Sequence, residues 1–111
     1  MMESRRKLAF FVIAQVESNG DPDAYNQLEQ AVGIVQIRPI VIRDLEGFTL
    51  KDRWCPEVSY EIFTAYMNKY GASTIEDHAR LWNGGPTRRG TDNYWERVHE
   101  EIRVLKSIES E

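Results

Sequence analysis

A single carboxylate stands at the end of the most apolar segment of the sequence. In the stretch "IAQVESNGDPDAYN", an apolar run leads directly to Glu17, which is followed by a hydroxyl residue and a polar turn. Burial at the end of an apolar helix disfavours the charged form of a carboxyl and raises its pKa. Such a group stays protonated and can donate its proton as a general acid. Glu17 is therefore the candidate general acid; the alternative is that it is only the exposed last residue of a helix.

Three other segments contain residues that could bind a substrate or orient this acid. In "AVGIVQIRP", Gly33 would let a substrate or another backbone approach closely, and Gln36 could bond to a substrate or simply satisfy backbone groups. In "ARLWNGGP", Asn83 is a polar candidate, and Trp82 could offer a substrate its aromatic face or belong to the core. In "TDNYW", Tyr94 could hydrogen-bond the acid or only pack at a helix start.

The elements that must position these residues read as helices. Residues 8–16 are apolar almost all round, which predicts a buried helix that ends at the Asn-Gly-Asp-Pro turn. Proline positions and apolar spacing predict further helices over residues 39–45, 56–69, 74–82 and from residue 92 onward. Ser73 and Glu76 have the spacing of a capping box. We expect an all-α fold of about five helices with little or no β structure.

Composition narrows the function. A chain of 111 residues with 41% hydrophobic residues fits a single domain over residues 1–111. The net charge of -4 argues against nucleic acid as a partner. No apolar run reaches the roughly 18 residues of a transmembrane segment, and "RRKLAFFVIA" lacks the cleavage site of a signal peptide. Cys55 is the only cysteine, and together with His78 and His99 it lacks ligand spacing, so we expect neither a disulfide nor a metal or other cofactor.

Taken in order, "VESNGDPDAYN", "AVGIVQIRP", "ARLWNGGP" and "TDNYW" resemble the four sequence signatures of lytic transglycosylases, a bacterial branch of the lysozyme-like superfamily. The resemblance runs from about residue 13 to residue 95. It implies a compact lysozyme-like helical domain that acts on peptidoglycan, and it leaves protein partners open. It also implies these roles: Glu17 as the catalytic acid, and Gly33, Gln36, Trp82, Asn83 and Tyr94 as substrate-binding or orienting residues.

The sequence departs from the family pattern in two of the four signatures. Trp82 stands where the third signature usually has Tyr, and Ile34-Val35 replaces the usual Leu-Met pair of the second signature. The Trp puts in doubt any phenol contact at that position. Ser18, which matches the serine after the acid, is expected to form hydrogen bonds at the helix end.

The type of reaction depends on a second carboxylate. Animal-type lysozymes have an Asp just before the Gly of the second signature, whereas this sequence has Gln30-Ala31-Val32 there. A site with one acid implies the transglycosylase route, in which Glu17 acts as acid and then as base. The β-1,4 bond between N-acetylmuramic acid and N-acetylglucosamine breaks, and the sugar's own 6-hydroxyl closes a 1,6-anhydro ring.

Two alternatives stay open. A true muramidase, a hydrolase, could use Glu29 as its second acid, or Asp21 or Asp23. A catalytically inactive relative could serve as a glycan-binding or assembly module of a phage particle or secretion apparatus, although such a protein would be free to lose Glu17. Without an evident export signal, the compartment is unknown; a bacterial or bacteriophage enzyme of this kind would act at the cell wall once other machinery delivered it.

Overall fold

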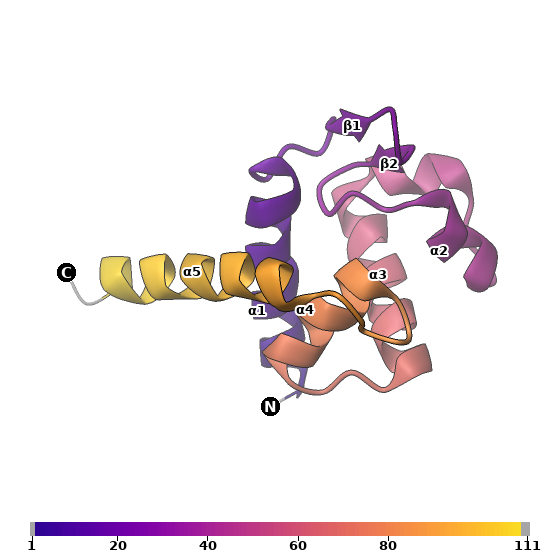
Figure 1. Cartoon of the computed structure of the whole chain (residues 1–111). Helices are drawn as coiled ribbons and strands as arrows, with labels where there is room; N and C mark the ends of the chain where they lie inside the picture. Colours follow the sequence, from indigo (N-terminus) through magenta and orange to yellow (C-terminus); the bar gives the residue numbers. More distant parts are fainter. Residues whose placement is uncertain (1, 110–111) are drawn as a thin grey trace.

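The computed structural model describes residues 2–109, in which five α-helices and one very short hairpin account for the regular structure apart from one 3-10 turn. This confirms the predicted all-α class with little β structure. The helix α1 (Met2–Ser18) stands at the centre of the arrangement and contacts α3, α4 and α5 (Figure 1). Ala9, Val12 and Ile13 are fully buried and Phe11 is 48% exposed, so α1 is buried on several sides, as predicted, but not all round.

The segment after α1 turns back and forms the hairpin. Asn19 and Gly20 adopt left-handed conformations with φ of 57° and 76°, which ends the helix where the sequence predicts. The strands β1 (Tyr25–Asn26) and β2 (Ala31–Val32) then pair antiparallel, with Tyr25 opposite Val32. Their burial differs: β1 is exposed and β2 is buried, so the hairpin lays one strand against the body of the protein.

Three elements follow the hairpin, and two of them agree with the prediction. They are α2 (Pro39–Asp44), the 3-10 helix η1 (Leu50–Trp54) and α3 (Pro56–Tyr70). Proline occupies the first turn of α2 and α3, where its missing N–H costs nothing, and Gly71 ends α3 in the left-handed conformation with φ of 73°. The sequence analysis did not predict η1.

The last two helices are α4 (Ile75–Gly84) and α5 (Asp92–Glu109). The N-cap of α4 is Thr74, whose hydroxyl accepts from the backbone N–H of Asp77 at 3.0 Å. The capping box predicted at Ser73 and Glu76 is therefore wrong, and Glu76 bonds to Arg80 instead. The first part of α5 packs against α1 and α4, and its C-terminal part projects away from the other elements (Figure 1).

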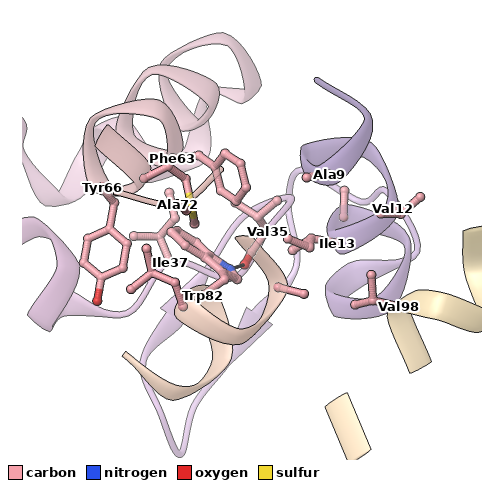
Figure 2. Packing of buried hydrophobic residues seen from close by; sticks show 14 of the residues in the cluster. Ala9, Val12, Ile13, Val35, Ile37, Phe63, Tyr66, Ala72, Trp82 and Val98 are labelled. Carbon is pink, nitrogen blue, oxygen red and sulfur yellow. Dashed lines mark hydrogen bonds between the residues drawn. The ribbon is translucent and has the colours of Figure 1, made fainter. Parts of the chain in front are cut away.

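Aromatic side chains from α3 and α4 form the middle of the core (Figure 2). The ring of Trp82 lies 5.1 Å from Phe63 and 5.8 Å from Tyr66, centroid to centroid. Its indole Nε1 donates to the backbone carbonyl of Val35 at 2.8 Å, so the core also fixes the segment that follows β2. His78, which lacks the spacing of a metal ligand, lies in this core, fully buried against Phe63.

None of the helices described here combines the length and the apolar character that crossing a bilayer requires.

Candidate active site

Glu17 lies in the last turn of α1, half-buried, with its carboxyl facing the start of α5. The hydroxyl of Tyr94 donates to its Oε2 at 2.7 Å. Burial raises the pKa of Glu17, as the sequence predicts; the Tyr94 hydrogen bond and the positive charges of Arg97 and Arg38 oppose this rise, and the negative charge of Glu29 adds to it. The geometry thus provides a carboxyl that tends to keep its proton, next to a donor that can stabilise its charged form.

Tyr94 is itself buried, with 6% of its surface exposed. Burial and the nearby Glu17 raise the pKa of Tyr94, so its hydroxyl stays protonated and remains a donor. A second contact joins the same two helices, because Arg97 donates to the backbone carbonyl of Val16 at 3.3 Å. Two contacts therefore hold the end of α1, which includes Glu17, against the first turns of α5.

Ser18 fixes the helix end from the other side. Its hydroxyl donates to the carbonyl of Ile34 at 2.7 Å and accepts from the backbone N–H of Asp21 at 3.0 Å. This is the role expected for Ser18. These hydrogen bonds tie Ser18, which is next to Glu17 in the sequence, to the chain that follows β2 and to the turn that follows α1.

A small pocket of about 90 Å³ adjoins the acid. Its lining residues are Glu17, Glu29, Ala31, Gln36, Arg38, Trp82 and Asn83. We call it the Glu17 pocket. Three of the residues predicted to bind substrate, together with the acid itself, therefore come together from α1, the segment after β2, and α4.

Two larger pockets continue from it. One of about 540 Å³ shares Arg38 and Asn83 with the Glu17 pocket, and one of about 310 Å³ shares Glu29 and Arg38 with it. Because these pockets share lining residues, they lie next to one another, and we call the three together the groove. A row of adjoining pockets that includes the acid offers several contact sites to a polymeric glycan.

The structure separates the alternatives that the sequence left open for Gln36 and Gly33. The side-chain amide of Gln36 donates to the carbonyls of Ala24 and Gly33 at 3.1 and 3.0 Å, so its nitrogen satisfies backbone groups. Gly33 is buried with φ of 88°, and a Cβ there would lie 2.1 Å from the carbonyl oxygen of Arg53. Its close approach is thus to the backbone of η1, and Gly33 lines none of the three pockets.

Trp82 and Asn83 differ although they are neighbours. Trp82 is 4% exposed and its ring packs in the core, which is the core alternative, and only part of it reaches the Glu17 pocket. Asn83 is exposed and borders both the Glu17 pocket and the pocket of about 540 Å³. Asn83 is the more accessible of the two to a bound sugar.

Sequence reasoning missed Arg38, which borders all three pockets. Its guanidinium donates to the carbonyl of Trp82 at 3.2 Å, and its charge lowers the pKa of Glu17. The available signal was its place two residues after Gln36, directly before Pro39, at the end of the second signature. Within residues 2–109, no three His, Cys, Asp or Glu side chains are arranged to hold a metal ion.

The elements and the site define a class. A carboxyl with a raised pKa, placed by the end of a central helix beside the pockets of a mainly helical domain, has the properties that a general acid requires. Residues 2–91 match the family model of the transglycosylase SLT domain, and the chain belongs to that family. Members of the family are peptidoglycan lytic transglycosylases, so this chain is a lysozyme-like enzyme with peptidoglycan as its substrate.

The match confirms the family predicted from the four signatures. It includes Glu17 and the residues of the second and third signatures, whereas Tyr94 lies beyond it. A comparison with curated proteins returned no significant match.

Proposed function

We propose that this chain cleaves the β-1,4 bond between N-acetylmuramic acid and N-acetylglucosamine as a lytic transglycosylase, with Glu17 as its only catalytic acid and base. The observation that carries the proposal is the placement of Glu17, half-buried at the end of α1 and hydrogen-bonded by Tyr94. Desolvation favours the protonated carboxyl that the first step needs.

In the first step, Glu17 gives its proton to the glycosidic oxygen as the bond from that oxygen to C1 of the muramic acid breaks. Glu17 is then a carboxylate. The Tyr94 hydroxyl and the positive charges of Arg38 and Arg97 stabilise this charged state. In the resting protein these three groups oppose the rise in the pKa of Glu17. During the reaction they stabilise the negative charge that develops on its carboxylate.

In the second step, the carboxylate of Glu17 accepts the proton of the sugar's 6-hydroxyl while that oxygen bonds to C1. The product ends in a 1,6-anhydro ring, no water is consumed and Glu17 regains its proton. We propose that Asn83, the accessible part of Gln36 and the edge of Trp82 contact the sugars in the Glu17 pocket. Gly33 contributes indirectly, by allowing the segment to pack on η1. Residues 1–111 would act as one catalytic domain.

A true hydrolase is the second candidate, because Glu29 lines the same pocket as Glu17. Its carboxylate could activate a water molecule on the opposite face of the sugar, which is the role of the second acid in glycosidases. Glu29 is exposed, on the connection between β1 and β2. In the transglycosylase mechanism this carboxylate has no chemical step.

Mass spectrometry of the soluble fragments from purified peptidoglycan separates the two candidates. The parent protein is compared with Glu17→Gln, Glu29→Gln and, as a matched surface control, Glu61→Gln, which changes an exposed residue of α3 outside the groove. We expect anhydro-ended fragments from the parent, Glu29→Gln and Glu61→Gln proteins and none from Glu17→Gln.

The contrary outcomes are distinct. Reducing ends that disappear in Glu29→Gln would establish the hydrolase. Fragments that persist in Glu17→Gln would remove Glu17 from the mechanism. An inactive parent protein that still binds peptidoglycan would contradict both candidates.

A further inference from the structure

The two larger pockets beside the Glu17 pocket share one wall. Arg38, Ile40 and Arg43 border both the pocket of about 540 Å³ and that of about 310 Å³. We call these two pockets together the arginine groove. Arg38 directly precedes α2 and Arg43 lies in its last turn, so one short helix presents two guanidinium groups along the groove.

Arg43 differs from most of the surface arginines. Its side chain is exposed, and among residues 2–109 its guanidinium has no hydrogen bond or ion pair. Arg80, Arg88 and Arg103, by contrast, each pair with a carboxylate at 2.7 or 2.8 Å. In a chain that has 18 acidic and 14 basic residues, a carboxylate partner for Arg43 would be easy to supply. The guanidinium at this wall of the groove has been left without one.

The acids near the arginine groove leave the guanidinium of Arg43 unpaired among the described residues. Asp44 is the one acid that lines the larger pocket, and its carboxylate is bound by Lys69 at 2.9 Å and by the hydroxyl of Tyr70. Both bonds lower the pKa of Asp44, so it is charged but already satisfied. Glu29 lines the smaller pocket without forming an ion pair to Arg38 or Arg43 within the described chain. The groove therefore offers positive charge with unused hydrogen-bond donors.

A carboxylate is the ligand that suits these donors. A guanidinium presents paired N–H groups that match the two oxygens of a carboxylate. Each muramic acid of the glycan carries a lactyl group, which either ends in a free carboxylate or continues into a peptide stem with carboxylates of its own. Chitin-like glycan, made of N-acetylglucosamine alone, has neither.

We infer that Arg43, together with Arg38, binds a carboxylate of the muramyl substituent and makes the groove selective for muramic-acid-containing glycan over uncharged glycan. The inference rests on the proposed function, because it takes peptidoglycan to lie along the groove that contains Glu17. Arg38 also acts on the charge of Glu17, so the decisive variant is Arg43→Gln.

Binding is measured in the Glu17→Gln background by calorimetry, so that no ligand is consumed. The ligands are soluble glycan strands with peptide stems, the same strands after an amidase has removed the stems, and chitohexaose. Lys51→Gln is the control, because Lys51 is another exposed cation that lines no part of the groove. We expect Arg43→Gln to weaken binding of a muramyl ligand roughly fivefold, an effect that added salt diminishes, and to leave chitohexaose binding unchanged.

The three ligands give each result a meaning. A loss confined to stem-bearing strands assigns the carboxylate to the peptide, and a loss confined to stripped strands assigns it to the lactyl group; either supports the inference. Equal weakening of chitohexaose, or no weakening beyond that of Lys51→Gln, would overturn it. A cation in the last turn of a helix also stabilises that helix, so the thermal midpoints of the variants are compared as a check on folding.

Failure of the proposed function gives a different pattern. In that case the parent protein releases no fragments from peptidoglycan and the Glu17→Gln protein binds none of the muramyl strands. If fragments form and strands bind, but Arg43→Gln changes nothing, the catalytic proposal stands and only the inference about Arg43 fails.

Discussion

Replacing Tyr94 with Phe removes one hydrogen bond and leaves the ring in place. The hydroxyl donates to Oε2 of Glu17 at 2.7 Å. While Glu17 is protonated, this bond joins two neutral groups and contributes about 0.5–1.5 kcal/mol; once Glu17 has given up its proton, the acceptor is charged and the bond contributes about 1.5–3 kcal/mol. The difference, about 1–1.5 kcal/mol, is available only as charge develops. Tyr94→Phe should therefore lower kcat roughly five- to tenfold.

The same substitution has a signature in the pH profile. The Tyr94 hydrogen bond lowers the pKa of Glu17, against the stronger effect of burial. Without that bond the pKa of Glu17 rises further. The pH range in which the rate falls because Glu17 loses its proton, which is one limb of the pH–rate profile, therefore moves to higher pH. The assay is the rate of anhydro-end formation on soluble glycan strands, measured by chromatography across the pH range for the parent and Tyr94→Phe.

Tyr60→Phe is the matched control, because Tyr60 is half-buried against Phe10, with ring centroids 5.1 Å apart, and lines no part of the groove. It should leave both rate and profile unchanged. A fall in rate at Tyr94→Phe with an unmoved limb, or a limb displaced to lower pH, would show that this hydroxyl does not bond Glu17 in the working enzyme. A loss above about a thousandfold would mean that Tyr94 takes part in the chemistry itself.

Three further predictions concern stability. Gly33→Ala combines a left-handed φ with a Cβ 2.1 Å from the carbonyl of Arg53, so it should lower the free energy of unfolding by about 3 kcal/mol or more in urea denaturation. Trp82→Phe loses the bond to Val35 and leaves a void; we expect a loss of about 2–4 kcal/mol by the same method. Burial raises the pKa of Glu17 in the folded protein above its ordinary value of 4.5, so the parent protein loses stability as the pH rises from 4.5 through the folded-state pKa. Glu17→Gln does not titrate, and its thermal midpoint should therefore exceed that of the parent above this pH interval. Below the interval, Glu17→Gln should lose this advantage.

Local physics is enough to predict much of the fold. Pro39 and Pro56 each open a helix, and Gly71 closes one, because proline fixes φ and glycine alone adopts the left-handed cap without strain. These helix ends depend on neighbours in the sequence, so the sequence contains them in readable form. The direction of the pKa shift of Glu17 was also predicted, from the apolar helix that leads to the acid, although the burial that causes the shift depends on packing.

Features that depend on distant segments were harder to predict. Arg53 is buried in η1 and donates to the carbonyls of Gln30 and Ile37 at 2.8 and 2.9 Å, joining the hairpin to the chain after it. No local pattern marks a charged residue for burial. Burial lowers the pKa of Arg53, and it is the backbone carbonyls around it that make the position tolerable. The residue at position 33 must be glycine because it packs closely on the same η1 segment. This contact also joins distant parts of the chain, so no local pattern could predict it.

The partner of the acid illustrates the limit most clearly. Glu17 and Tyr94 are 77 positions apart, and no periodicity relates them. Their proximity was expected only through the order of family signatures, and it depends on α5 crossing the end of α1. Local chemistry could indicate that an acid would stay protonated, but only the packing of helices could supply the group that stabilises it when charged.

This dependence on packing has a consequence for how the site is built. The end of α1 is tied to Ile34 through Ser18, and to α5 through the Tyr94 hydroxyl and the Arg97 guanidinium. The contacts from α5 depend on the docking of its buried side chains, such as the fully buried Val98, which lies beside the α1 face (Figure 2). Glu17 is therefore not set by its own helix alone. If α5 separates from α1, Tyr94 no longer bonds Glu17 and burial no longer raises the pKa of Glu17 to the same degree, so both properties on which its proposed role depends weaken together.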